Sequence, residues 1–391
     1  MPWKKTDRLG QRYDLVRQMN AGEVTVSELC RRVKISRQTA YKWRRRYRGG
    51  RLKALADRSR AARKVFGKPT QLWLERMRRI RQRRSTWGAR KLRHCLGLDF
   101  GEATLPSVAA ISRWLKHWGL ARGRSRRKAG PVVLRAALRP ARRSNEVWTV
   151  DFKGHYRTGD GTRVEPLTMR DLHSRYGLRV GLQRSVGWRE TRKGFQKVFN
   201  KYGLPKRIRC DNGTPFGGAG PTGLTRLSAW WVKLGIQVEF IAPGRPDQNG
   251  AHEQFHRVYK KEVAKNPALT LAGQQRRSNR WLEIYNQQRP HEALGMKVPA
   301  HYYRKNRRPA PKGVSPWKYA RGWERRWVKG NGEISRKGKR RFIGEAFVGD
   351  YVGLKPQRAN VWKVYFGPIL IGELHENETG NIRTACYRRC R

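Results

Sequence analysis

The pattern of apolar and polar positions near the N-terminus predicts two short helices separated by a tight turn. One helix is expected over 26–33, and Ser36 is a typical N-cap for a second that ends near Tyr47. Ala40, Trp43 and Tyr47 recur at helical spacing, so they are expected to pack inward. The opposite face is polar and basic, and it carries Arg37, Gln38, Thr39, Lys42, Arg45 and Arg46. This pattern is typical of a helix-turn-helix domain whose second helix reads the DNA major groove, although a basic helical pair that contacts only phosphates is an alternative.

A second set of helical stripes follows and predicts another helix-turn-helix domain. Helical spacing begins after Thr70 and stops at Gly119. The stripes consist of Trp73, Met77, Ile80, Leu92, Leu96, Val108, Ile111, Leu115 and Trp118. The segment 122–143 that follows has nine basic residues, no acid and two prolines, so it is expected to be a linker lying along phosphates. Its candidate DNA contacts are Arg124, Arg126 and Arg127.

The period of the apolar pattern changes in the rest of the chain. Short apolar and β-branched runs predict strands over 147–152, 166–169, 178–182, 207–211 and 236–241, with helices over 189–202 and 224–234. A further helix is expected to carry Glu253 near its start. Beyond residue 340, aromatic and β-branched runs broken by Gly, Pro and Asn predict a small antiparallel β-barrel. The expected domains are 1–60, 61–120, a linker over 121–145, 146–303 and 304–391.

Charge narrows the possible partners of these domains. The 391 residues include 90 Lys and Arg against 28 Asp and Glu, so the net charge is +62. A chain this basic needs a polyanion to neutralise it, which indicates nucleic acid. The net charge is +33 over 1–145 and +15 over 302–391, but only +14 over the 156 residues between them. The middle block holds the largest share of the carboxylates, 13 of 28, and a reaction that needs carboxylates is therefore expected there.

Several other classes are excluded by composition. There is no run of apolar residues long enough to span a membrane, and no apolar signal-peptide run follows the first five residues. Five scattered cysteines do not make a disulfide framework, so reduced thiols in the cytoplasm are expected. Cys386 and Cys390 have no second pair of zinc ligands at a suitable spacing, so we expect no metal there.

Three carboxylates of the middle block lie where a shared site is expected. Asp151 is embedded in an apolar strand, Asp211 ends a second strand, and Glu253 begins a helix. A buried carboxylate needs a cation, a proton or a metal ion. Three carboxylates on two strand ends and a helix can converge to hold two divalent ions for in-line phosphoryl displacement.

The residues around these carboxylates resemble a known family. The runs Trp148–Asp151, Cys210–Phe216 and Pro243–Glu253 are similar, in this order, to the catalytic core of bacterial insertion-sequence transposases related to retroviral integrases. The run Tyr285–Gly295 is similar to the segment that closes that core. The resemblance implies an RNase H-like α/β core within a multidomain α+β protein, a DDE triad at Asp151, Asp211 and Glu253, and two Mg²⁺ ions, for which Mn²⁺ can substitute. The 41 residues between the second and third carboxylates exceed the family's usual spacing, which a loop insertion over 217–223 would explain.

Other patterns in the core compete with this interpretation. His252-Glu253-x-x-His256 matches the zinc-protease motif, although nothing supplies the third ligand and the motif leaves Asp151 unexplained. The Gly-rich run 218–223 fits a dinucleotide-binding pattern but has no strand directly before it. Asp171 and Asp247 are further candidates for metal ligands. Arg257, Lys260 and Lys261 follow Glu253 and are expected either to contact phosphates or to form a solvated basic face.

The function expected from these features is DNA transposition. Two metal ions would activate a water that cleaves the element end, and the freed 3′-OH would attack target DNA. The helix-turn-helix domains would read the terminal inverted repeats. The resemblance also implies a dimer or tetramer on DNA, in a bacterial cytoplasm and associated with the nucleoid. A DNA-binding regulator that has lost catalysis and, remotely, a zinc hydrolase remain as alternatives.

Overall fold

The computed structural model describes most of the chain as two compact units, residues 1–68 and 69–391. The described residues are 8–58, 70–102, 105–121, 138, 140–218, 222–242, 246–378 and 381–385, with the side chains of 246 and 247 left out. Arg124, Arg126, Arg127, Cys386, Cys390 and part of the Gly-rich run therefore lie outside the described residues. No helix among the described residues is long and apolar enough to cross a membrane.

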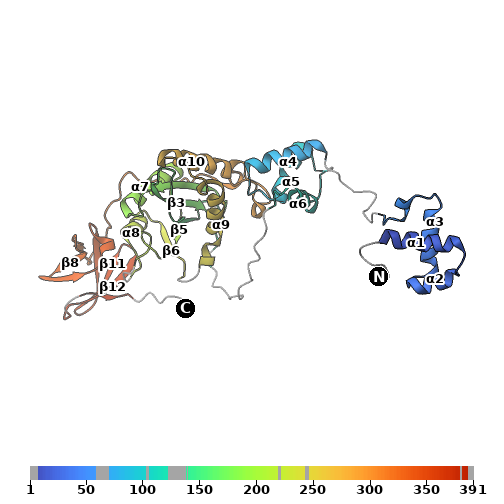
Figure 1. Cartoon of the computed structure of the whole chain (residues 1–391). Coiled ribbons are helices and arrows are strands. Elements are labelled where there is room, and N and C mark those ends of the chain that lie inside the picture. The colour runs from blue at the N-terminus through green and yellow to red at the C-terminus, as the bar shows by residue number, and fades with distance from the viewer. Residues whose placement is uncertain are drawn as a thin grey trace. The chain divides into compact units, whose positions relative to one another are not determined.

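The first unit is a small helical domain. It contains α1 (Arg8–Ala21), α2 (Val26–Val33), α3 (Arg37–Tyr47) and the 3₁₀ turn η1 (Leu52–Leu55) (Figure 1). Ser36 caps α3 by accepting a hydrogen bond from the Thr39 amide, and Ala40 and Trp43 are buried, so both predicted helices are confirmed. The sequence pattern did not predict α1. One of its buried residues is Arg12, which lies over the Trp43 ring at 4.0 Å and donates to the Leu55 carbonyl.

The second unit begins with the predicted second helical set. It consists of α4 (Gln71–Arg83), α5 (Ala89–Phe100) and α6 (Val108–His117). Thr70 and Ser107 cap α4 and α6. The apolar stripes meet in one cluster around Met77, Leu92 and Ile111, which confirms the predicted helices.

A mixed sheet forms the centre of the second unit. Its strands are β1 (Val147–Phe152), β2 (Tyr156–Arg157), β3 (Arg163–Asp171), β4 (Gly177–Gln183), β5 (Arg207–Cys210) and β6 (Gln237–Phe240). The strand order is β4-β3-β1-β5-β6, with the short β2 also paired to β3. β3 is antiparallel to β1 and β4, whereas β1, β5 and β6 are parallel. This is the RNase H-like arrangement that the resemblance implied.

Helices cover both faces of this sheet (Figure 1). They are α7 (Trp188–Tyr202), α8 (Arg226–Lys233), η2 (Pro246–Asn249), α9 (Gly250–Tyr259), the π-helical turn η3 (Lys260–Ala264), α10 (Leu271–Gln287), η4 (Glu292–Leu294) and α11 (Pro299–Tyr302). One core joins the sheet to α7 and α8 through Trp148, Phe195 and Trp231. The other joins Val180 to α9 and α10 through Phe255 and Trp281.

The C-terminal part is a small β domain, but it is not a closed barrel. Its elements are β7 (Glu324–Trp327), β8 (Glu333–Arg336), β9 (Lys339–Phe342), η5 (Glu345–Phe347), β10 (Tyr351–Arg358), β11 (Val361–Phe366), β12 (Ile369–His375) and β13 (Arg383–Thr384). The five-stranded sheet runs β13-β12-β11-β10-β7, and β8-β9 form a separate hairpin. The expected barrel is wrong in this respect. The sheet buries its apolar face in a cluster that includes Ala229 and Val232 of α8, so it does not need to close on itself.

Candidate active site

The two aspartates of the predicted triad lie at the same edge of the central sheet. Asp151 is near the end of β1, and Asp211 directly follows β5. β1 and β5 are parallel and paired, with Trp148 opposite Ile208, so their carboxyl ends meet at one edge. Side chains alternate along β1: Trp148 and Val150 enter the α7 and α8 core, which directs Thr149 and Asp151 toward α9.

The third carboxylate is on the helix that covers this face. Glu253 lies in the first turn of α9 and is exposed. Burial, followed by the charge of Asp211 and more weakly that of Glu253, raises the pKa of Asp151 to about 7. Burial also raises the pKa of Asp211. The charge of Asp151 therefore interacts with those of Asp211 and Glu253.

The donor set fits a hard divalent cation in its chemistry, because all three side chains offer carboxylate oxygens. Burial, and after it repulsion from the neighbouring carboxylates, raises the Asp151 pKa, and a bound cation offsets both effects. Among the described residues, however, no three His, Cys, Asp or Glu side chains are gathered closely enough to hold an ion. The side chain of Asp247, in the turn just before α9, is not described, so that expectation stays untested.

Two histidines connect α9 to the strands beneath Asp151. His252 is fully buried, with Nε2 2.6 Å from Thr168 Oγ1 and Nδ1 2.8 Å from Thr149 Oγ1. His256 Nε2 is 2.7 Å from the same Thr168 oxygen. Thr168 itself donates to the Asp151 carbonyl at 2.9 Å, so its hydroxyl accepts from both imidazoles. This network fixes α9, and thus Glu253, relative to Asp151.

These contacts do not support the zinc-hydrolase alternative. Both ring nitrogens of His252 are used in hydrogen bonds, which leaves none to bind a metal ion. Burial lowers the pKa of His252 far below its usual value and that of His256 to about 3, so both rings are neutral. The 3.7 Å approach of His256 Nδ1 to Asp151 Oδ2 is therefore not an ion pair, despite its short distance.

Asp171, the other candidate ligand with a described side chain, has a structural role. It is fully buried and accepts hydrogen bonds from the backbone amides of Asn145 at 2.7 Å and Ser174 at 2.8 Å, and from the Ser174 hydroxyl. It pairs with Trp148 in the sheet register, at the end of β1 away from Asp151. Backbone and serine donors therefore satisfy this carboxylate, which gives no support to Asp171 as a metal ligand.

The basic residues after Glu253 are exposed next to the candidate site. Arg257 is on α9, while Lys260 and Lys261 begin the π-helical turn. Lys153 follows β1, and its pKa is lowered by burial and by the charge of Lys260, which places these two ammonium groups near each other. The border of the site is therefore cationic on this side, as phosphate binding requires.

The motif of 285–291 has a role that the sequence alone did not indicate. Asn286 pairs with both the amide and the carbonyl of Gly177, each at 2.8 Å, and so holds α10 to β4. Arg289 donates to Glu262 at 3.2 Å and to Thr86, which precedes α5, at 3.0 Å. Lys91 of α5 donates to the Pro290 carbonyl at 2.5 Å. The motif therefore connects the second helical set to the domain built around the central sheet.

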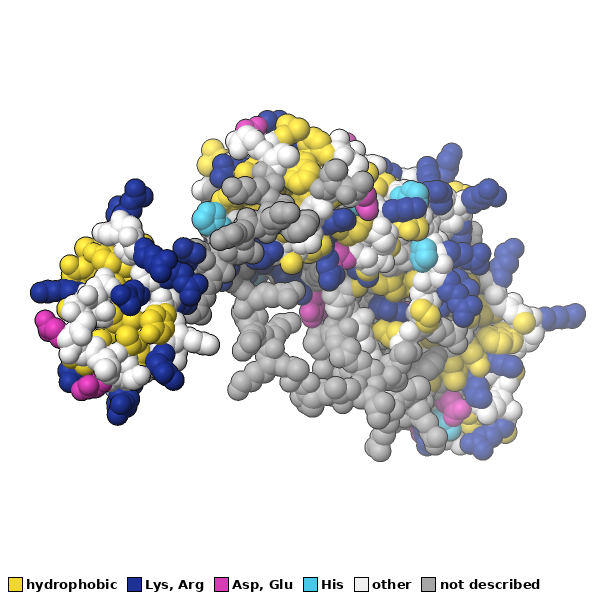
Figure 2. Space-filling view, turned by 90° about the vertical axis from the view of Figure 1, so that its right-hand side faces the viewer, with side chains coloured by type: hydrophobic (Ala, Val, Ile, Leu, Met, Phe, Trp, Pro, Cys, Tyr) yellow, Lys and Arg dark blue, Asp and Glu magenta, His cyan; other side chains and the backbone are white. Residues whose placement is uncertain are grey.

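The predicted reading face of α3 is exposed in the first unit. Arg37, Gln38, Lys42 and Arg45 are exposed, and Thr39 and Arg46 are half-buried. The Arg46 guanidinium lies over the Trp43 ring at 4.8 Å, which fixes part of its side chain. Figure 2 shows Lys and Arg side chains spread over the visible surface, with few acidic side chains among them.

Comparison with known families agrees with this arrangement. Two integrase core domain families match residues 141–246 and 234–299, and the C-terminal domain of IS481 family transposases matches 324–380. A helix-turn-helix domain matches 11–64, and a homeodomain-like domain matches 39–115. The chain therefore combines an integrase core, helix-turn-helix domains and a C-terminal domain of the kinds found in insertion-sequence transposases. Its helix-turn-helix domains make this transposase a DNA-binding protein.

Individual relatives are more distant. The transposase is 28% identical over 207 residues to an uncharacterized protein of insertion element IS407 from Burkholderia multivorans, covering 53% of this chain and 72% of the relative. It is also 28% identical over 237 residues to an uncharacterized protein of insertion element IS476 from Xanthomonas euvesicatoria, covering 60% of this chain and 65% of the relative.

Solved structures show weaker likeness. The HTLV-2 integrase catalytic core domain in complex with magnesium matches with 19% identity and a TM-score of 0.34, over 42% of this chain and all of that chain. A chain of the simian T-cell lymphotropic virus intasome in complex with PP2A regulatory subunit B56 gamma matches with 16% identity and a TM-score of 0.37, over 76% of this chain and 96% of that chain.

The raised pKa of Asp151 predicts a pH-dependent difference in stability. The folded transposase holds the Asp151 proton up to about pH 7, whereas an unfolded chain releases it near pH 4. The favourable contribution of the protonated form is thus present at low pH and lost as the pH rises through about 7. We compare the free energies of unfolding of the Asp151→Asn variant and the native chain in EDTA. The value for the variant minus that for the native chain is expected to be about 2 kcal/mol larger at about pH 8 than at about pH 5.

Urea unfolding at the two pH values measures this difference. Glu283→Gln is the matched control, because Glu283 is exposed on α10 and the change removes the same charge. The difference between native chain and control is expected to be independent of pH. An Asp151→Asn difference that is equally flat would show that Asp151 is ionised like an ordinary surface carboxylate.

Proposed function

We propose that this transposase binds the terminal inverted repeats of a mobile element, cleaves a strand at the element end and joins the freed 3′-OH to target DNA. Asp151, Asp211 and Glu253 are the proposed catalytic residues, and they would hold two Mg²⁺ ions, with Mn²⁺ as a substitute. The observation that carries this proposal is the placement of Asp151 and Asp211 at one sheet edge beneath α9, where burial, then the charge of Asp211 and more weakly that of Glu253, raises the Asp151 pKa to about 7. The setting of that edge in an integrase core supports it.

The chemistry supplied by bound Mg²⁺ is activation of the attacking hydroxyl and neutralisation of charge at the phosphate during in-line displacement. Asp151 and Asp211 offer their oxygens from adjacent parallel strands, so the sheet fixes their relative position. Thr168, His252 and His256 fix α9 and therefore orient Glu253. The neutral histidines add no positive charge that would compete with a cation for the carboxylates.

Outside the carboxylates, we assign DNA binding to the basic faces. The α3 residues Arg37, Gln38, Thr39, Lys42, Arg45 and Arg46 would contact base edges and phosphates in the major groove. Arg257, Lys260 and Lys261 would hold phosphates beside the cleavage site, and Arg124, Arg126 and Arg127 would add contacts from the linker. Two element ends have to be joined in one reaction, so we propose a dimer or tetramer on DNA, in the bacterial cytoplasm and associated with the nucleoid.

Metal-dependent nicking tests this proposal against the alternative of a DNA-binding regulator. Purified native chain is incubated with a labelled duplex that carries the element's terminal repeat, in Mg²⁺, in Mn²⁺ and in EDTA. We expect strand cleavage at the repeat boundary with either metal ion and none in EDTA, with the duplex bound in every case. Specific binding without cleavage in either metal ion would instead identify a regulator.

A further inference from the structure

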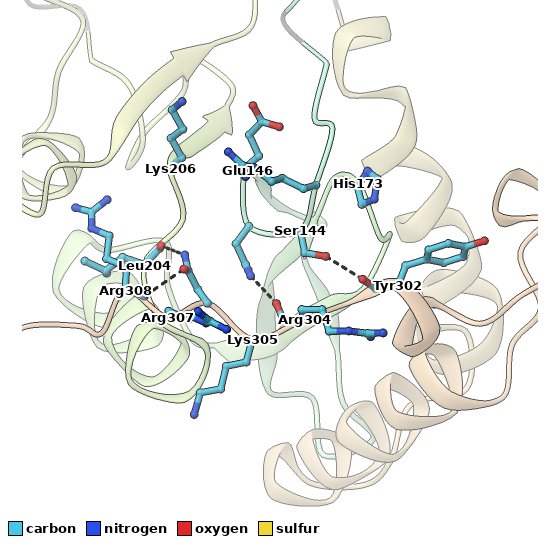
Figure 3. A pocket seen from close by; sticks show the side chains of 13 residues that line it. Ser144, Glu146, His173, Leu204, Lys206, Tyr302, Arg304, Lys305, Arg307 and Arg308 are labelled. Atoms are coloured by element: carbon cyan, nitrogen blue, oxygen red, sulfur yellow. Dashed lines mark hydrogen bonds between the residues drawn. The ribbon is translucent and has the colours of Figure 1, made fainter.

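A basic pocket lies at the edge of the central sheet opposite the candidate active site. It is a cavity of about 640 Å³ lined by 143–146, which lead into β1, by 204 and 206 before β5, by His173, and by 302 and 304–308 (Figure 3). β1 runs from this pocket to Asp151, and at ~3.3 Å per residue the six steps from Asn145 span roughly 20 Å. One phosphodiester cannot occupy both places.

The lining of this pocket is strongly cationic. It includes six Lys and Arg side chains, Arg143, Lys206, Arg304, Lys305, Arg307 and Arg308, and one acidic side chain, Glu146. Glu146 is already engaged, because it accepts from the Arg142 amide at 2.7 Å and from Arg207 at 3.5 Å. The pocket therefore has a large excess of positive charge that its own carboxylate does not neutralise.

The six cations divide into two groups. Arg304 donates to the carbonyls of His301 and Tyr303, and Arg308 donates to those of Leu234 and Gly235, so these two guanidinium groups hold the chain in place. The other four, Arg143, Lys206, Lys305 and Arg307, are exposed, and within the described part of the chain they have no hydrogen bond or ion pair through their side chains. These four are free to bind an anion.

Hydrogen bonds hold the three walls of the pocket together. Ser144 Oγ donates to the Tyr302 carbonyl at 3.1 Å, and Asn145 Nδ2 donates to the Arg304 carbonyl at 2.7 Å (Figure 3). The Leu204 amide donates to the Arg308 carbonyl at 2.8 Å. The free cations therefore project from backbone that is already fixed, which lowers the entropy lost when they bind.

We propose that this pocket binds backbone phosphates of a DNA segment distinct from the phosphodiester at the three carboxylates. The inference rests on the proposed function for its ligand, since unpaired Lys and Arg on several segments match a chain of phosphates. Element-end DNA and target DNA share this chemistry. The pocket would thus be a second DNA-binding site of the transposase, at the edge of the central sheet opposite Asp151.

The salt dependence of DNA binding tests this inference. Lys305→Gln/Arg307→Gln is made in an Asp151→Asn background and compared with that background alone, using two duplexes, one with the terminal repeat and one of arbitrary sequence. Each lost phosphate contact reduces the magnitude of the negative slope of log K for association against log salt by about 0.9, so we expect this magnitude to decrease by about 2. The matched control is Arg276→Gln/Arg280→Gln, two exposed arginines one turn apart on α10.

The outcome also separates the two DNA sources. A decrease confined to the repeat duplex assigns the pocket to the element end, and a decrease on both duplexes assigns it to DNA of any sequence, including the target. An unchanged slope on both duplexes, or an equal decrease in the control, overturns the proposal. This result is independent of the proposed function, whose failure would appear as absence of metal-dependent nicking by the native chain.

Discussion

Asp151→Asn is expected to lower the rate of Mg²⁺-dependent strand cleavage by about a thousandfold while leaving binding of the terminal-repeat duplex unchanged. Asparagine has nearly the same shape but carries no charge, so it cannot hold a divalent ion between itself and Asp211. Loss of about 4 kcal/mol of transition-state stabilisation corresponds to this decrease in rate. Cleavage of an end-labelled duplex under single-turnover conditions measures it.

The Asp151→Asn variant is expected to remain folded. Because burial and neighbouring carboxylates disfavour the charged form of Asp151, the asparagine is expected to stabilise the fold near neutral pH. Glu283→Gln, which removes an exposed charge on α10, should cleave at the native rate. Cleavage by Asp151→Asn at a rate close to that of this control would contradict the assignment of Asp151.

His252→Ala is expected to destabilise the second unit by about 3 kcal/mol. The change removes a fully buried ring, leaves a cavity between α9 and the sheet, and removes one hydrogen-bond partner from each of the Thr149 and Thr168 hydroxyls. The free energy of unfolding from urea titration measures the loss. Glu253→Gln, on the exposed side of the same turn, should leave this free energy within about 0.5 kcal/mol of the native value.

This prediction also separates the two interpretations of the His252-Glu253-x-x-His256 motif. If His252 positions α9, His252→Ala lowers the free energy of unfolding. In that case neither the native chain nor the variant contains stoichiometric zinc as purified. A zinc site would give the opposite pattern, in which the native chain contains zinc and His252→Ala loses it with little loss of stability.

Sequence patterns predicted the elements whose buried positions are apolar and regularly spaced. β1 is an example, because Val147, Trp148 and Val150 are all buried and the strand ends close to its predicted boundary. Ser36 and the stripe that follows it predicted α3 for the same reason. The relation between Asp151 and Asp211 could be expected as well, since carboxyl ends of parallel strands meet at one edge.

Other elements were missed because polar residues fill their buried positions. α10 buries Gln274 and Ser278 as well as Trp281 and Tyr285, so only part of its buried face is apolar and the sequence shows no complete apolar stripe. Ser278 hydrogen-bonds to Tyr259, a long-range contact that no local pattern reports. The network of Thr149, Thr168 and His252 was missed in the same way, although an apolar strand with isolated threonines on one face was an available signal.

The open C-terminal sheet was mispredicted for a different reason. Alternating apolar runs indicate strands with one buried face, but they do not indicate what covers that face. Here Ala229 and Val232 of α8 belong to the cluster that the sheet buries, and Lys233 pairs with Asp350. The helix that packs against the sheet, α8, ends 91 residues before the first strand of the sheet, β7.

Joining of DNA strands tests the central claim most directly. A labelled terminal-repeat duplex is incubated with a target plasmid and Mg²⁺, and the products are separated to detect label covalently joined to the plasmid. We expect the native transposase to form this joint product and Asp211→Asn to form none while still binding the repeat duplex. Joint product formed by Asp211→Asn at the native rate, or none formed by a native chain that binds the duplex, would contradict the account.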